Sequence, residues 1–242
     1  MADFKAFLRA FWRLAMECVF PAFCLGCGVD GEFLCADCAN VIQRQKNQLC
    51  PSCCHVETDG GRCENCRKDT GAGFFLDSLV CVSAYEEKSL LARAIHAFKY
   101  DFISDLAGGL AGLLTEKIKE TDLSGFVICP VPLHLKRLRW RGFNQAELLA
   151  ADAGIATGLE VQNLLERTSY SGPQMELKKE ERARNVAGAF RCVGPHPPQM
   201  MPPKVLLLDD VATTLSTLNA CAKALKEAGA KTVCAIVLAR AY

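Results

Sequence analysis

Four Cys-x-x-Cys pairs between residues 24 and 66 carry the clearest chemistry in the chain. They are Cys24/Cys27, Cys35/Cys38, Cys50/Cys53 and Cys63/Cys66. Two thiolates separated by two residues can reach one ion from a single tight turn, and two such turns complete a tetrahedral site of four sulfurs. Such regular spacing favours metal over disulfides in a chain that we expect to be cytoplasmic, so we predict two structural zinc ions.

Two pairing schemes are open for these eight thiols. In the sequential scheme the first two pairs bind one ion and the last two pairs bind the other. In the cross-braced scheme the first pair joins the third and the second joins the fourth. We prefer the sequential scheme because it closes shorter loops and so costs less chain entropy. A redox role is the competing interpretation, but redox motifs usually occur singly beside a strand–helix unit.

An acidic segment followed by hydroxyl side chains forms a second candidate site. The apolar run "KVLLLDD" (204–210) is predicted to be a strand that ends on Asp209 and Asp210. The hydroxyl residues that lead into the next predicted helix are Thr213, Thr214, Ser216 and Thr217. Carboxylates accept hydrogen bonds from vicinal ribose hydroxyls, and a helix start suits a phosphate. We therefore predict a pocket for a phosphorylated sugar; otherwise the acids are turn residues and a hydroxyl is a helix cap.

A cationic segment follows another predicted strand, "FVICPVP" (126–132). Its basic residues are His134, Lys136, Arg137, Arg139 and Arg141. So many cations at one strand end indicate an anion with several charges, and pyrophosphate fits because arginines bind it through bidentate contacts. Nucleic acid is the alternative ligand, since Trp140 could stack on a base. A solvated basic loop is the third interpretation.

A sheet of parallel strands must bring these segments together. The β-like runs are 79–85, 126–132, 204–210 and 232–240, and the helical runs are 88–100, 106–120, 144–158 and 217–229. Continuous apolar strands separated by helices are typical of a parallel sheet that is covered on both faces. Ligands of such α/β folds bind at the carboxyl ends of the strands, which is where both candidate segments lie.

Composition and cysteine distribution divide the chain into three parts. Half of the residues are hydrophobic, which excludes wholesale disorder. The net charge is only +1, so a charged ligand must be recognised by a local cluster of charges and not by the overall charge of the protein. Ten of the 15 cysteines lie between residues 18 and 66. We predict an amphipathic helix over 1–21, a double zinc ribbon over 22–70 and an α/β domain over 71–242.

The predicted first helix has its charges at four-residue intervals, which interrupt the apolar stretch that an export signal needs. We expect this helix to pack on the rest of the protein, and the alternative is peripheral contact with a membrane surface. No segment of the sequence is long and apolar enough to span a bilayer. These features predict a cytoplasmic location.

Several motifs in fixed order resemble the ComF family of competence-associated, phosphoribosyltransferase-like proteins. They are "VFPAFCLGCG", "AFKY", "PVPLHLKRLRWRGFNQAELLA", "ERTSYSGPQMELKKEERARNVAGAF" and "LLLDDVATTLSTL". The resemblance spans nearly the whole chain. It implies a type I phosphoribosyltransferase fold with a small N-terminal double zinc ribbon. It also implies phosphoribosyl pyrophosphate as ligand, together with Mg²⁺.

The resemblance implies roles for individual residues as well. Asp209 and Asp210 would be the catalytic pair that holds the ribose hydroxyls, and Thr213 through Thr217 would cradle the 5-phosphate. Lys136, Arg137 and Arg141 would face the pyrophosphate. Lys99 would approach the leaving group, and further family positions match Gln174, Arg182 and Asn185. These roles require acids that are not consumed in buried ion pairs.

One residue departs from the family pattern. The phosphate loop of the family normally has glycine where this chain has Leu215. We expect leucine to be strained at a positive φ, by about 1–3 kcal/mol, and to place a side chain where the anion would bind. Two hypotheses follow: a phosphoribosyltransferase with weakened ligand binding, or a non-catalytic protein. The second would bind single-stranded DNA or a helicase-type competence protein during DNA uptake.

Overall fold

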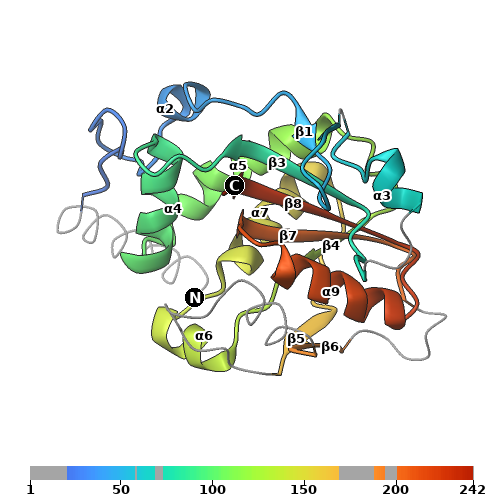
Figure 1. Ribbon diagram of the computed structural model, residues 1–242. Helices are drawn as coiled ribbons and strands as arrows, with labels where there is room; N and C mark the ends of the chain where they lie inside the picture. Colours follow the sequence, from blue (N-terminus) through green and yellow to red (C-terminus); the bar gives the residue numbers. More distant parts are fainter. Residues whose placement is uncertain (1–20, 58, 69–72, 169–187, 194–200, 242) are drawn as a thin grey trace, which may run out of the picture.

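The computed structural model describes residues 21–57, 59–68, 73–168, 188–193 and 201–241 (Figure 1). The predicted helix over 1–21 lies almost wholly outside the described residues, as do Gln174, Arg182 and Asn185. The predicted domain boundary near residue 70 also falls there. Among the described residues, no helix is long and apolar enough to cross a membrane.

A sheet of four parallel strands forms the centre of the molecule, in the order β3-β8-β7-β4 (Figure 1). The strands are β3 (Ser78–Ala84), β4 (Val127–Pro130), β7 (Lys204–Ala212) and β8 (Thr232–Arg240). All four runs predicted as strands are strands, and the α/β class with a parallel sheet is confirmed. Parallel pairing places their carboxyl ends, and the loops that follow, at one edge of the sheet.

Helices cover both faces of this sheet, which explains why the strands are continuously apolar. On one face α4 (Leu90–Tyr100), α5 (Leu106–Lys119) and α7 (Gln145–Thr157) enclose a core that includes Leu208 and Ile236. On the other face α9 (Ser216–Glu227) encloses a core that includes Leu207 and Val237. Successive residues of β7 and β8 thus point into different cores.

Two elements near the carboxyl edge differ from the prediction. The cationic segment is a helix, α6 (Leu135–Arg141), and not a loop. His134 caps it by accepting a hydrogen bond from the Lys136 N–H through Nδ1, at 3.1 Å, and Gly142 ends it with a left-handed φ of 84°. The second element is an antiparallel pair, β5 (Leu165–Arg167) with β6 (Phe190–Cys192), which packs beside α9.

The strand β7 does not end at the two acids but continues to Ala212. The cause is its neighbour β8, which extends far enough to pair Asp209 with Val237 and Ala212 with Arg240. On the other side β4 stops at Pro130, opposite Leu208. The two acids therefore lie inside β7, at the point where one of its two neighbouring strands has ended.

The cysteine-rich segment attaches to the α/β domain at two places. Its elements are α2 (Ala36–Asn40), β1 (Gln48–Leu49), β2 (Val56–Glu57) and α3 (Glu64–Lys68). The part around α2 packs on α5, where Gly109 leaves room for Leu34: a Cβ on this glycine would lie 3.2 Å from the leucine Cβ.

The part around β1 lies along the outer edge of β3. The buried Gln48 side chain donates to the Cys81 carbonyl at 3.1 Å and accepts from the Cys81 N–H at 2.8 Å. The Leu79 N–H donates to the Gly60 carbonyl at 2.9 Å, and the Gln45 N–H donates to the Val82 carbonyl at 2.7 Å. Gln45, Gln48 and Gly60 thus satisfy backbone groups on the free side of this strand.

Candidate functional site

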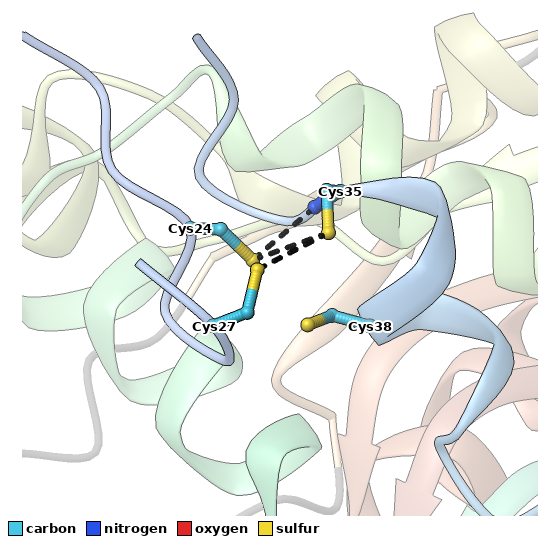
Figure 2. Close-up of side chains that lie close together, drawn as sticks. All are labelled: Cys24, Cys27, Cys35 and Cys38. Atoms are coloured by element: carbon cyan, nitrogen blue, oxygen red, sulfur yellow. Dashed lines mark hydrogen bonds between the residues drawn. The ribbon is translucent and has the colours of Figure 1, made fainter. Parts of the chain in front are cut away.

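The eight thiols form two clusters, and each could hold one metal ion. The clusters are Cys24, Cys27, Cys35, Cys38 and Cys50, Cys53, Cys63, Cys66, with all sulfurs of a cluster within 4.8 Å of one another. Figure 2 shows the first cluster, in which the four side chains point toward a common centre. This grouping is the sequential one, so the preferred pairing scheme is confirmed and the cross-braced scheme is excluded.

The sulfur spacing matches a tetrahedral zinc site. Sulfurs at about 2.3 Å from a central Zn²⁺ lie about 3.8 Å apart. The Sγ atom of Cys35 lies 3.6 Å from that of Cys24 and 3.7 Å from that of Cys27. In the second cluster the Cys53 and Cys63 sulfurs are 3.6 Å apart. Both clusters therefore have the dimensions of closed, structural S₄ sites.

Thiol ionisation in the first cluster indicates the need for a cation. Burial raises the pKa of Cys24, but backbone N–H groups, with that of Cys35 at 3.4 Å, outweigh burial and bring the pKa to about 6. The pKa of Cys38 rises to about 12 because of its hydrogen bonds with Cys24 and Cys27. A thiolate thus forms easily at Cys24 and not at Cys38, so the two are stable as thiolates together only around a metal ion.

The acid pair on β7 is close to a lysine from another element. Lys99, in the last turn of α4, places its Nζ 2.9 Å from Asp210 Oδ1, and both side chains are largely buried. Burial lowers the pKa of Lys99, but the charge of Asp210, the hydrogen bond to it and the charge of Asp209 together outweigh burial and raise the pKa above its usual value. Asp210 is thus consumed in a buried ion pair, which counts against the predicted role of both acids as free ligands.

Asp209 is the acid that remains for a ligand. Among the described residues it makes no ion pair, and one of its oxygens, Oδ1, accepts the Asp210 N–H at 2.9 Å. Burial raises its pKa to about 7, with a further contribution from the charge of Asp210. A carboxyl group with such a pKa can donate a hydrogen bond when it is protonated and only accepts hydrogen bonds when it is ionised.

The loop between β7 and α9 presents its hydroxyls to solvent and hides its leucine. Thr213 and Thr214 are exposed, and Thr214 Oγ1 lies 2.8 Å from Ser216 Oγ. Leu215 has the predicted positive φ, 59°, at the N-cap position of α9. Its side chain is 6% exposed and belongs to the core under α9, so the expectation that it fills the anion position is wrong.

Cations from α6 and β5 face the acids across this edge. Burial lowers the pKa of Arg141, while the charges of Asp210 and Asp209 raise it, so this guanidinium lies near both acids. Burial also lowers the pKa of Arg167, and the neighbouring charge of Arg137 lowers it further. The charge of Asp209 acts on Arg167 in the opposite direction, so Arg137, Arg167 and Asp209 lie in one neighbourhood at this edge.

Sequence analysis missed Arg167 and the partner of Lys99. Arg167 stands in the quoted motif "ERTSY", but nothing in a single sequence places β5 beside α6. Asn144 and Gln145 have structural roles instead. Asn144 Nδ2 donates to the Val131 carbonyl at 3.1 Å, and Gln145 Oε1 accepts from Arg141 at 2.5 Å. These contacts fix α6 and α7 at the end of β4.

Three curated relatives resemble the chain over most of its length. Competence protein ComFC of Streptococcus pneumoniae is 32% identical over 87% of this chain and 89% of its own. Competence protein F of Haemophilus influenzae is 29% identical over 87% of this chain and 98% of its own. DNA utilization protein YhgH of Salmonella typhimurium is 30% identical over 83% of this chain and 87% of its own. No protein-family model matches the chain.

Two solved structures have weaker likeness. Glutamine phosphoribosylpyrophosphate amidotransferase from B. subtilis superimposes with a TM-score of 0.38 and 18% identity, over 55% of this chain and 26% of that one. Hypoxanthine phosphoribosyltransferase from Trypanosoma cruzi superimposes with a TM-score of 0.32 and 14% identity, over 58% and 68% of the two chains.

Proposed function

The chain belongs to the ComF family of competence proteins, and from this premise we propose that it binds phosphoribosyl pyrophosphate during DNA uptake. Its relatives are named for competence and for DNA utilization. The phosphoribosyltransferase-like fold supplies the sheet edge at which the ligand would lie. We also propose two structural zinc ions and a cytoplasmic location.

One observation carries this proposal: three groups with complementary chemistry meet at the carboxyl edge. Asp209 offers a carboxylate for ribose hydroxyls. The exposed hydroxyls of Thr213 and Thr214, with the N-terminus of the 12-residue helix α9, suit the 5-phosphate. Arg137 and Arg167, of which the first acts on the second through its charge, add two cations for a pyrophosphate.

The left-handed conformation of Leu215 supports the phosphate assignment. Glycine in this position gives a loop the backbone angles that direct N–H groups toward an anion. Leu215 adopts such angles, and its side chain packs away from the loop surface into the core. The loop thus combines the backbone form of the family with an apolar anchor.

The oxygen donors of this edge also fit Mg²⁺. The carboxylate of Asp209 and the hydroxyls of Thr213 and Thr214 are hard ligands of the type that Mg²⁺ shares with phosphate oxygens. When bound, the ion would neutralise charge on the pyrophosphate. The chain itself would orient the sugar through Asp209 and hold the anion through Arg137 and Arg167.

Binding is a stronger candidate than transfer of the phosphoribosyl group. Transfer would call on both acids of the pair, whereas the ion pair with Lys99 already occupies Asp210. A protein that only binds the ligand during DNA uptake needs Asp209, the loop between β7 and α9, and the cations Arg137 and Arg167. Its partners in uptake would be single-stranded DNA and a helicase-type competence protein.

Calorimetry with phosphoribosyl pyrophosphate and Mg²⁺ tests this proposal. We expect wild type to bind, Asp209→Asn to lose at least tenfold in affinity, and Asp152→Asn on α7 to match wild type. An absence of heat with wild type, or unchanged affinity in Asp209→Asn, would overturn the assignment. Pyrophosphate released on incubation with candidate acceptors would show that the protein is a transferase instead.

A further inference from the structure

Three exposed aromatic side chains lie together beside the site, where α4 ends and α6 passes. Tyr100 is 51% exposed, Phe102 is 42% exposed and Trp140 is 60% exposed. The ring centroids of Phe102 and Trp140 are 5.2 Å apart in an edge-to-face arrangement, and those of Tyr100 and Trp140 are 6.4 Å apart. Large rings are normally buried, so three in contact on the surface point to a ligand.

A strained backbone conformation keeps one of these rings, that of Phe102, at the surface. Phe102 has a φ of 58°, in the left-handed region that bulky residues rarely adopt. Unlike Leu215, it gains no burial in the core that would offset the strain. Strained residues of this kind cluster at ligand sites. The conformation keeps the ring against Trp140 at the surface.

The surroundings of the rings are mainly cationic. The Arg141 guanidinium lies 5.7 Å from the Tyr100 ring centre and 6.0 Å from that of Trp140. Helix α6 also carries Lys136, Arg137 and Arg139, and it has no acidic residue. On the α4 side, His96 Nδ1 lies 4.0 Å from Asp101 Oδ2, and this aspartate is the acidic group next to Phe102.

We propose that Tyr100, Phe102 and Trp140 form a platform on which unpaired bases of single-stranded DNA stack, while the cations of α6 contact the phosphates. Aromatic faces stack on any base, and a row of cations follows a phosphate backbone. The open shape favours a strand over a small molecule, because rings that are about half exposed cannot enclose one. Duplex DNA does not fit this site, because the faces of its bases are stacked on one another inside the double helix.

This assignment rests on the proposed role in DNA uptake, but not on the sugar-phosphate site. The aromatic rings and Asp209 lie on different elements, and the two sites share cations of α6: Arg141 is near both, and Arg137 is also assigned to the pyrophosphate. Loss of the rings should therefore leave phosphoribosyl pyrophosphate binding intact. If DNA binding fails while that binding persists, the platform alone is wrong.

Fluorescence anisotropy of a labelled 20-nucleotide oligothymidine tests the platform in the full-length protein. We expect Trp140→Leu to weaken binding about fivefold or more, since one base–ring stack is worth that much. Trp140→Phe should restore most of the loss, because phenylalanine also stacks. Ile155→Ser, which removes an exposed apolar side chain from α7, should match wild type.

Three further measurements separate stacking from charge and from other ligands. In a Trp12→Phe background Trp140 is the only tryptophan, and its fluorescence should be quenched by the oligonucleotide. Equal affinity for a duplex of the same length, or unchanged affinity in Trp140→Leu, would overturn the platform. If thymidine monophosphate displaced the oligonucleotide at an equal concentration, the ligand of the platform would be a single nucleotide and not a strand.

Discussion

Leu215 shows how one residue can take a conformation that normally belongs to glycine. Its positive φ costs about 1–3 kcal/mol, whereas full burial of a leucine side chain contributes about 1.5–3 kcal/mol. The side chain is buried in the core under α9, so the two contributions nearly cancel. The family resemblance predicted the strain, because the family normally has glycine at this position. It did not predict the burial, because the core partners come from elements distant in sequence.

Leu215→Gly should therefore affect stability and not ligand binding. We expect a fall of about 1–3 kcal/mol in the free energy of unfolding, since the cavity outweighs the strain that is relieved. Affinity for phosphoribosyl pyrophosphate should stay within about twofold, because the loop backbone is unchanged. Urea titration and calorimetry measure the two effects, and a large gain in affinity would show that leucine obstructs the anion.

Asp209 should make stability fall as pH rises. Burial raises its pKa from 3.8 to about 7 in the folded protein, so the folded state binds the proton more tightly than the unfolded state. The stabilisation from this proton is present below pH 4 and is lost between pH 4 and pH 7. Asp209→Asn should thus have a higher Tm than wild type at pH 8 and a similar Tm at pH 4.

Asp210→Asn is the matched control for this pH effect. It leaves the largely buried Lys99 without its carboxylate partner, so we expect a lower Tm than wild type at both pH values. If the two variants respond to pH in the same way, the acids titrate as a unit and the distinct roles assigned to them are wrong.

At the scale of elements, the long apolar strands and long helices could be predicted and the short elements could not. Helix α6 has seven residues, five of them basic or aromatic, and no buried side chain. Its pattern therefore lacks the apolar face by which helices are recognised. What stabilises it are local caps at His134 and Gly142, together with the contacts that Asn144 and Gln145 make with neighbouring elements.

Asn144→Ala tests how firmly this corner is held. The side chain of Asn144 caps α7 by accepting the Ala146 N–H at 3.1 Å, and it also satisfies the buried Val131 carbonyl. Loss of both bonds should lower the free energy of unfolding by about 1–3 kcal/mol, as measured in urea. Asn47→Ala, at an exposed position, should change it by less than about 0.5 kcal/mol.

At the scale of the whole molecule, the cysteine-rich segment attaches to the α/β domain through two separate contacts. The thiol spacing predicted both clusters, because it encodes ligand geometry directly, and the preference for sequential pairing came from the shorter loops that it closes. The attachments could not be predicted, because they depend on pairs such as Gln48 with Cys81, 33 residues apart. Metal at the second cluster should therefore support the sheet as well as its own loops.

Metal analysis and chelation test this coupling. We expect two zinc ions per chain and a lower Tm of the whole protein after chelator treatment, since the edge contacts of β3 would be lost. Cys63→Ser should lower the Tm more than Cys27→Ser, because the first cluster packs on α5 and leaves the sheet edge untouched. Equal shifts in the two variants would contradict the coupling.

The hydrogen bonds along the free side of β3 have a consequence for behaviour in solution. A strand edge with unsatisfied N–H and C=O groups is a template on which other chains pair and aggregate. The segment from Gln45 to Glu57, together with Gly60, covers this edge, yet it has few apolar side chains to keep it folded without metal. Zinc starvation should therefore turn this protein into a self-associating one, with precipitation preceding any loss of its central helices.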